Sequence, residues 1–240
     1  MSHAVPPNRR VIVFDLDDTL YPEQDYVRSG LRAAGDFARV HFAIDGIAAI
    51  AISLFESGRR ADLFQAAFEL LGYERPTEEW IGALVRAYRN HPPSIRMFGD
   101  VAAVLPELGQ QGRLALLTDG YLSPQRLKVK ALGVDALCDP VIYTEEMGRH
   151  CWKPAPDAFI SLEQRCGARP EECIYIGDNP AKDFVAPRLR GWQSVRVRRP
   201  GTEHAQAKAS RGQEAHFEVT DFWQLRRLLV SRAARTRHDL

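Results

Sequence analysis

Cysteine is scarce in this chain of 240 residues, which contains only four of them. No two stand in a C-x-x-C spacing, so the sequence gives no indication of a zinc site or a redox pair. The first ten residues, MSHAVPPNRR, lack the apolar segment of a secretory signal. We therefore expect a cytoplasmic protein with reduced thiols. The cysteines are Cys138, Cys151, Cys166 and Cys173.

Long apolar runs and a strong net charge are also missing. No apolar stretch approaches the length that crosses a bilayer, and the net charge of +1 gives no overall attraction to nucleic acid or membrane. The charge is uneven, because residues 186–240 carry 12 Lys and Arg against 5 Asp and Glu, whereas residues 1–185 carry 20 against 26. The basic segment has no recognisable nucleic-acid-binding signature, so we expect a solvated helix face and a frayed tail.

Several common catalytic and ligand-binding motifs are absent. The sequence has no Walker-type glycine-rich loop, no G-x-S-x-G, and no zinc-ligand spacing among its seven histidines. The spacing of Asp15, Asp17 and Thr19 matches the start of an EF-hand calcium loop. That loop needs glycine at its sixth position, where this chain has Leu20. These absences leave other classes of site to consider.

What the chain does contain is an alternation of short β-branched runs and helical patterns. This alternation predicts βαβ units and a parallel sheet. Ser123 and Pro124 are typical of an N-cap and a first helical residue. The predicted strands are 11–14, 113–118 and 173–177, with weaker candidates at 140–143 and 194–197, and the predicted helices are 99–110, 124–132, 155–167 and 180–190.

Residues 23–95 interrupt this alternation, because they contain no convincing strand. Amphipathic patterns predict four helices there, with Gly72 ending the third and Thr77 opening the fourth. We therefore predict a helical domain over 23–95, inserted into a core made of 1–22 and 96–240. The four predicted helices are 26–42, 46–56, 59–72 and 78–90.

Polar residues follow the ends of three predicted strands. Asp15, Thr118 and Asp178 lie at or one residue beyond a strand end, where ligands bind in open α/β sheets. Asp15 could attack phosphorus as a nucleophile, and Asp17 could protonate the leaving oxygen. Asp178 and Asp183, with oxygens from the loop after the first strand, make an oxygen site suited to Mg²⁺. Lys153 adds positive charge, and Thr118 can help to hold a phosphate.

Four motifs carry a family resemblance: FDLDDTL, LLTDG, KPAPDAF and GDNPAKD. Together they resemble motifs I to IV of the haloacid dehalogenase-like hydrolase superfamily. The resemblance implies an α/β, Rossmann-like parallel sheet with helices on both faces and an inserted all-helical cap of the C1 type. It also implies a Mg²⁺ cofactor. The implied roles are Asp15 as nucleophile, Asp17 as general acid/base, Thr118 as phosphate-binding residue, Lys153 as charge-balancing residue, and Asp15, Asp17 (through its carbonyl), Asp178 and Asp183 around the metal.

The loop Thr118, Asp119 and Gly120, with Lys153, is expected to bind the phosphate. Asp119 stands where Asn is common, and a carboxylate beside a phosphate is unfavourable unless it points away, so its role is left open. Asn179 could orient Asp178. Five arginines in or beside the helical insertion are candidate anion contacts, although surface positions on helices are the commoner explanation for each. They are Arg28, Arg32, Arg59, Arg60 and Arg96.

The sequence favours a Mg²⁺-dependent phosphatase that acts on a small phosphorylated metabolite through an aspartyl-phosphate. An acid at Asp17 is typical of the phosphatases and phosphomutases of the superfamily, whereas the dehalogenases lack it. A phosphomutase, a 2-haloacid dehalogenase and a non-catalytic binding protein on the same fold are the alternatives. No nucleic acid or membrane partner is expected, and a monomer or a homodimer is left open.

Overall fold

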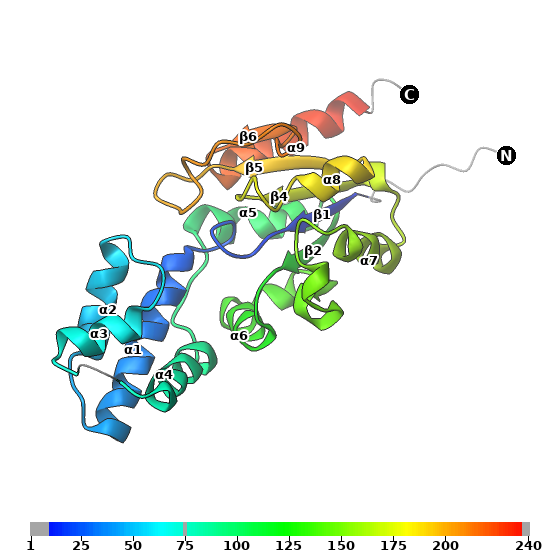
Figure 1. Cartoon of the computed structure of the whole chain (residues 1–240). Coiled ribbons are helices and arrows are strands. Elements are labelled where there is room, and N and C mark those ends of the chain that lie inside the picture. The colour runs from blue at the N-terminus through cyan, green and yellow to red at the C-terminus, as the bar shows by residue number, and fades with distance from the viewer. Residues whose placement is uncertain (1–9, 74–75, 237–240) are drawn as a thin grey trace. The chain divides into compact units, whose positions relative to one another are not determined.

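The structure, a computed structural model, describes residues 10–73 and 76–236 (Figure 1). Residues 1–9, at the chain start where no secretory signal is expected, lie outside the described residues. The last four residues of the expected frayed tail also lie outside them. Two compact units are present. One comprises Met1–Pro22, Arg96–Gln125 and Leu132–Leu240, and the other comprises Glu23–Ile95 with Arg126–Ala131.

The first unit contains a six-stranded parallel sheet with the order β3-β2-β1-β4-β5-β6 (Figure 1). The chain therefore builds outward from β1 first on one side and then on the other, which places a topological switch between β1 and β4. The predicted parallel α/β sheet is confirmed. The strands are β1 (Val11–Phe14), β2 (Arg113–Thr118), β3 (Val141–Tyr143), β4 (Cys173–Gly177), β5 (Gln193–Val197) and β6 (Phe217–Val219).

Helices cover both faces of this sheet. On one face Val11 and Val13 belong to a buried cluster with Phe159 of α7 and Ala186 of α8. Side chains alternate across a strand, so Phe14 points to the other face, where its ring stacks on Phe222 of α9 at 5.8 Å. The helices of this unit are α5 (Gly99–Gly109), α7 (Asp157–Cys166), α8 (Val185–Arg190) and α9 (Phe222–Thr236), and the short 3-10 helices are η1 (Val134–Ala136), η2 (Thr144–Met147), η3 (Arg149–Cys151) and η4 (Pro170–Glu172). Helix α6 (Leu122–Leu132) is divided, because its residues Arg126–Ala131 belong to the second unit.

The predicted start of α6 was wrong. The helix begins at Leu122, so Ser123 and Pro124 lie in its first turn and Ser123 is not the N-cap. The backbone N–H of Leu122 donates to Glu145 Oε2 at 2.5 Å. A carboxylate from a distant segment therefore caps the helix, and proline is tolerated in the first turn because N–H groups there have no intrahelical partner.

The predicted start of α8 at residue 180 was also wrong, because this helix begins at Val185. The preceding residues form a turn in which the backbone N–H groups of Lys182 and Asp183 both donate to Asn179 O. The Asp183 side chain accepts from the N–H groups of Asp178 and Asn179 at 3.1 and 2.9 Å. These bonds hold the segment as a loop.

β6 and α9 complete the sheet unit in a region where the sequence predicted only a helix face and a frayed tail. β6 has three residues, and α9 buries Phe222, Leu225 and Leu229. The arginines between the apolar residues of α9 give the segment a basic character, so the sequence did not predict that part of it belongs to the core. None of the helices in the described residues combines the length and the apolar character that crossing a membrane requires.

The second unit contains four helices around its own apolar cluster, which includes Leu31, Ile47, Phe68 and Leu84. The predicted capping of α4 is confirmed, because Thr77 Oγ1 accepts from the N–H of Trp80. The third helix is shorter than predicted and starts at Leu63, because Asp62 before it has a left-handed backbone conformation with a φ of +50°. The helices are α1 (Glu23–Phe42), α2 (Ile47–Glu56), α3 (Leu63–Leu70) and α4 (Glu78–Asn90).

Asp100 connects three parts of the sheet unit. Its Oδ2 accepts from Arg199 Nη2 and from the N–H of Phe222, both at 2.7 Å. Burial raises the pKa of Asp100, but the bonds from Arg199 and Phe222 outweigh this, so its pKa lies below the ordinary value. The stabilisation is therefore present above the pKa of the unfolded chain, about 3.9, and is lost as pH falls through the folded-state pKa.

We predict that Asp100→Asn lowers the free energy of unfolding by about 2 kcal/mol at neutral pH, because two charge-assisted hydrogen bonds are weakened. The difference from wild type should begin to narrow below about pH 4, where the unfolded chain takes up a proton at this carboxyl group, and should be smallest below the lowered folded-state pKa, where the native carboxylate is protonated too. Urea unfolding at several pH values measures both effects. Asp135→Asn, at an exposed position of η1, is the control. Equal stability of Asp100→Asn and Asp135→Asn at neutral pH would contradict the prediction.

Candidate active site

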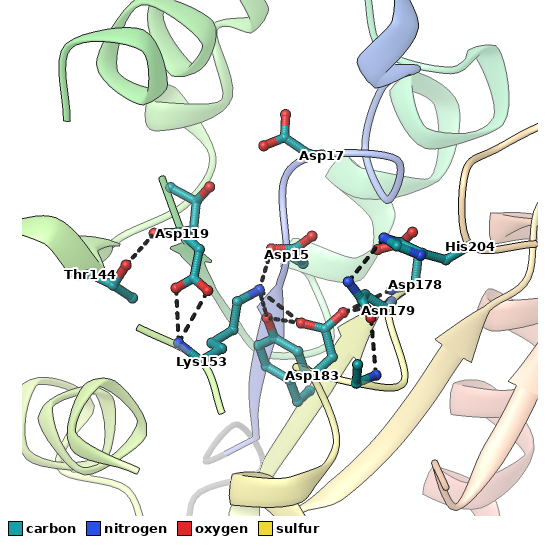
Figure 2. A network of polar contacts seen from close by, with 12 residues as sticks. Asp15, Asp17, Asp119, Thr144, Lys153, Asp178, Asn179, Asp183 and His204 are labelled. Atoms are coloured by element: carbon teal, nitrogen blue, oxygen red, sulfur yellow. Dashed lines mark hydrogen bonds and ion pairs between the residues drawn. The ribbon is translucent and has the colours of Figure 1, made fainter. Parts of the chain in front are cut away.

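The predicted site residues converge at the carboxyl ends of β1, β2 and β4 (Figure 2). Asp15 directly follows β1, and its N–H donates to Ile176 O of β4 at 2.8 Å. Thr118 is the last residue of β2, and Asp178 directly follows β4. Parallel pairing of β1 with both neighbours brings these three ends to one edge of the sheet.

The ammonium group of Lys153 lies at the centre of one group of contacts. Lys153 Nζ donates to Asp15 Oδ1 at 2.6 Å, to Asp183 Oδ1 at 2.8 Å and to the Tyr175 hydroxyl at 2.9 Å. Figure 2 shows these contacts converging on the lysine nitrogen. The Lys153 side chain is only 3% exposed, so the charge is held away from bulk water. Its pKa is raised well above the ordinary value, because the attraction of Asp15 and Asp183 outweighs the burial that lowers it.

Asp183 supports the loop that carries Asp178. Its Oδ1 accepts from Lys153 and from the Tyr175 hydroxyl, and its Oδ2 accepts from two backbone N–H groups of the loop. Asn179 Oδ1 accepts from the N–H of Ala181, and its amide nitrogen lies 2.9 Å from His204 Nε2. The Asp183 carboxylate thus ties the lysine to the backbone of the loop after β4.

Three carboxylates share this buried space with one ammonium group. One oxygen each from Asp15, Asp178 and Asp183 lies within 4.8 Å of the others. Burial, reinforced by Asp183 and opposed by Lys153, raises the pKa of Asp15 to about 7. Burial and the neighbouring carboxylates Asp183 and Asp15 raise the pKa of Asp178 to about 10. The excess of negative charge means that a cation at this position would be strongly favoured.

The donor set fits a hard divalent cation. Asp178 Oδ2 is buried and has no hydrogen-bond partner among the described residues, although buried carboxylate oxygens are normally satisfied. Carboxylate oxygens are the ligands that Mg²⁺ prefers. Asp183 differs from Asp178, because both of its oxygens already accept protein hydrogen bonds.

Asp17 belongs to a second group of contacts. Figure 2 places its carboxylate beyond Asp15, outside the contacts around Lys153. The Tyr21 hydroxyl donates to Asp17 Oδ1. The Gln125 amide nitrogen donates to Asp17 Oδ2 at 2.9 Å and to Thr118 Oγ1 at 2.6 Å. The carboxylate is therefore held from both sides.

Asp119, which Gly120 follows in the chain, contacts residues of both groups. The Asp119 carboxylate accepts from the backbone N–H of Lys153 at 3.1 and 3.2 Å, so it holds the lysine segment. Gly120 has a φ of +125°, a conformation that strongly favours glycine. The Asp119 carbonyl accepts from Gln125 Nε2 at 2.5 Å.

Sequence reasoning overlooked three side chains at the site. Tyr175 lies inside a predicted strand, Gln125 lies inside a predicted helix, and Tyr21 lies just before the predicted helical insertion. Side-chain alternation could have placed Tyr175 on one face of β4, but its contact with Lys153 depends on tertiary structure.

Three of the five candidate arginines have partners within the helical unit. Arg28 pairs with Glu56 and Arg59 with Asp62. The Arg60 guanidinium donates to Phe55 O and lies over the Phe55 ring. Arg32 and Arg96 are exposed. The commoner explanation, a surface position, accounts for these arginines.

Known proteins resemble this chain in sequence and in fold. The sequence model of the family described as haloacid dehalogenase-like hydrolase matches residues 9–188. A glyceraldehyde 3-phosphate phosphatase of Methanopyrus kandleri is 29% identical, over 79% of this chain and 84% of that relative. A phosphoserine phosphatase of Thermus thermophilus is 28% identical, over 79% of this chain and 89% of that relative. The magnesium-bound HAD hydrolase YfnB of Bacillus subtilis superposes with a TM-score of 0.65 at 18% identity, covering 92% of this chain and 99% of that structure.

Gly177 leaves room for the Asp183 carboxylate. A Cβ atom at Gly177 would lie 2.4 Å from Asp183 Oδ2 and 2.7 Å from Asp183 Cγ. We predict that Gly177→Ala lowers the free energy of unfolding by about 1 to 3 kcal/mol, because the carboxylate must leave its two N–H donors. Thermal or urea unfolding measures the loss.

Gly109→Ala is the matched control, because its added Cβ would lie 3.7 Å from the nearest atom, an ordinary contact. This control should be neutral or stabilising. Wild-type stability in Gly177→Ala would mean that the Asp183 contacts do not hold the loop as described.

Proposed function

The chain belongs to the haloacid dehalogenase-like hydrolase family, and we propose that it is a Mg²⁺-dependent phosphatase acting on a small phosphomonoester through an aspartyl-phosphate. The observation that carries this proposal is the placement of Asp15 against the buried Lys153 ammonium at 2.6 Å. A carboxylate at a strand end, next to fixed positive charge, suits attack on phosphorus.

In the first step the Asp15 carboxylate attacks phosphorus and the bond from phosphorus to the ester oxygen breaks. Asp17 gives its proton to the departing oxygen, which leaves as the alcohol. In the second step the Asp17 carboxylate takes a proton from water as the water oxygen attacks phosphorus. The bond to Asp15 then breaks, inorganic phosphate leaves, and both aspartates return to their initial states.

The other polar residues bind and orient the phosphate. Lys153 offsets the negative charge around Asp15, and the Thr118 hydroxyl binds a phosphate oxygen. Asp119 holds Lys153 through its backbone N–H, and Gly120 allows the turn after β2. We assign Thr118, Gly120 and Lys153 to the phosphate, and Asp119 to support of the lysine.

The metal would be held by Asp15, Asp178 and the backbone carbonyl of Asp17. Asp183 would fix the loop that carries Asp178 through its hydrogen bonds to the loop backbone. A bound divalent cation supplies charge neutralisation at the phosphoryl oxygens. The unpartnered Asp178 Oδ2 and the uncompensated carboxylates support this assignment. Mg²⁺ is the ion that we propose.

Small metabolites are the proposed substrate class. The two named relatives are phosphatases of glyceraldehyde 3-phosphate and of phosphoserine, so short, charged phosphomonoesters are the first compounds to test. The cytoplasmic location stays a prediction from the sequence.

We predict Mg²⁺-dependent phosphate release from p-nitrophenyl phosphate and from members of a panel that contains phosphoserine and glyceraldehyde 3-phosphate. EDTA should abolish release, and Asp15→Asn should reduce kcat by about a thousandfold or more while the fold remains intact. Asp135→Asn, an exposed substitution, should behave as wild type. Undiminished release by Asp15→Asn would rule out the mechanism. Isomerisation of a hexose 1-phosphate would favour a phosphomutase, and halide release from a 2-haloacid would favour a dehalogenase.

A second prediction concerns the metal alone. Saturating Mg²⁺ should raise the free energy of unfolding of wild type by about 2 to 4 kcal/mol. Asp178→Asn should be more stable than wild type without metal, because it removes one of the repelling carboxylates, and should gain almost nothing from Mg²⁺. Thermal unfolding with Mg²⁺ and with EDTA measures both shifts, and Asp135→Asn is again the control. Equal Mg²⁺ stabilisation of Asp178→Asn and wild type would refute the metal assignment.

A further inference from the structure

Gln125 connects the loops that follow β1 and β2. It lies on α6 and is only 2% exposed. Its Nε2 atom is 2.9 Å from Asp17 Oδ2, 2.6 Å from Thr118 Oγ1 and 2.5 Å from Asp119 O. An amide nitrogen has two hydrogens, so three acceptors share two donors at this point. One uncharged side chain thus contacts two residues to which the proposed function gives chemical roles.

The direction of the Gln125 amide follows from its partners. A carbonyl and an ionised carboxylate only accept hydrogen bonds, so the Asp119 carbonyl and the ionised form of Asp17 require the NH₂ end. The opposite atom, Oε1, is buried and has no hydrogen-bond partner within the described part of the chain. A buried unsatisfied oxygen costs free energy. The hydrogen bonds of the NH₂ group must therefore stabilise this orientation by more than the unsatisfied Oε1 costs.

Gly120 leaves the space that Gln125 occupies. A Cβ atom at Gly120 would lie 3.4 Å from the Cδ, Cγ and Nε2 atoms of Gln125, a tight separation. The backbone N–H of Gln125 also donates to Tyr121 O at 3.2 Å. The turn after β2 therefore fixes where the amide lies.

These contacts restrict Asp17 and Thr118 at the same time. Asp17 Oδ1 accepts from the buried Tyr21 hydroxyl and Oδ2 accepts from Gln125, so rotation of the carboxylate is blocked at both oxygens. Because Thr118 Oγ1 accepts from Gln125, its own hydroxyl proton is directed to another acceptor. In the proposed reaction that acceptor is the phosphate.

We propose that Gln125 is a positioning residue, which orients Asp17 for proton transfer to the leaving oxygen and Thr118 for the phosphate. This inference rests on the proposed function. It assigns no contact between Gln125 and the substrate. The effect of Gln125 should therefore depend on how much the leaving group needs a proton.

The test compares two substrates of similar shape. p-Nitrophenolate leaves readily without a proton, whereas phenolate is the poorer leaving group and gains more from general acid catalysis. In Gln125→Met, which keeps the length of the side chain and removes its donors, kcat for phenyl phosphate should fall about 10- to 100-fold. The fall for p-nitrophenyl phosphate should be about tenfold smaller. Gln111→Met, at a half-buried glutamine before β2, is the control and should match wild type on both substrates.

A purely structural role would lower kcat for both esters by the same factor, and that result would overturn the proposal. A folded Gln125→Met that keeps wild-type kcat on both esters would overturn it as well. If the Met variant does not fold, Gln125→Leu, which likewise removes the donors, is measured in its place. The same selective loss on phenyl phosphate is expected.

A double-substitution cycle tests whether the effect passes through Asp17. In an Asp17→Asn background, which removes the acid itself, kcat should fall more for phenyl phosphate than for p-nitrophenyl phosphate, and Gln125→Met should no longer alter the ratio of the two rates. A selective effect of Gln125→Met that persists in this background would overturn the assigned route. Failure of the proposed function would be recognised separately, because wild type would then release no metal-dependent phosphate from either ester.

Discussion

The buried ammonium group of Lys153 is the contact on which the site depends. It lies between Asp15 and Asp183 and also donates to Tyr175, so it joins the ends of β1 and β4 to the segment after η3. Without it, three carboxylates would share a space from which water is largely excluded. With it, one of the three negative charges is offset, and the remaining negative charge favours a cation beside Asp178. The loop after β4 is shaped by the same constraint, because Asp183 holds its backbone while accepting from the lysine.

The polar residues divide into two groups with different tasks. The first surrounds Lys153 and manages charge at the proposed nucleophile. The second surrounds Asp17, which Tyr21 and Gln125 hold by its two oxygens. Asp119 belongs to both, because its carboxylate accepts from the Lys153 backbone and its carbonyl accepts from Gln125. We infer that proton transfer and phosphate binding are aligned through this shared residue, although it has no chemical step of its own.

Local sequence was sufficient for what depends on local pattern. The β-branched runs ending at Asp15 and Gly177 predicted two central strands, and Thr77 correctly marked the start of α4. Prediction failed where a distant residue decides the outcome. Glu145 caps α6 from another segment, so the prediction of Ser123 as the N-cap was wrong. The hydrogen bonds of Asp183 to the loop backbone keep the residues before Val185 out of α8. Gln125 was missed because a buried amide inside a helical pattern has no distinguishing sequence signal. The roles of the site residues stay predictions, which the geometry supports by bringing them together.

The central claim is that the phosphoryl group passes through Asp15. The most direct measurement is an acid quench during turnover of p-nitrophenyl phosphate with Mg²⁺, followed by mass spectrometry of the peptide that contains Asp15. We expect one phosphoryl group on Asp15, which appears within the first turnover and disappears when substrate is exhausted. Steady phosphate release with no phosphorylated Asp15, under conditions that preserve acyl phosphates, would contradict the account.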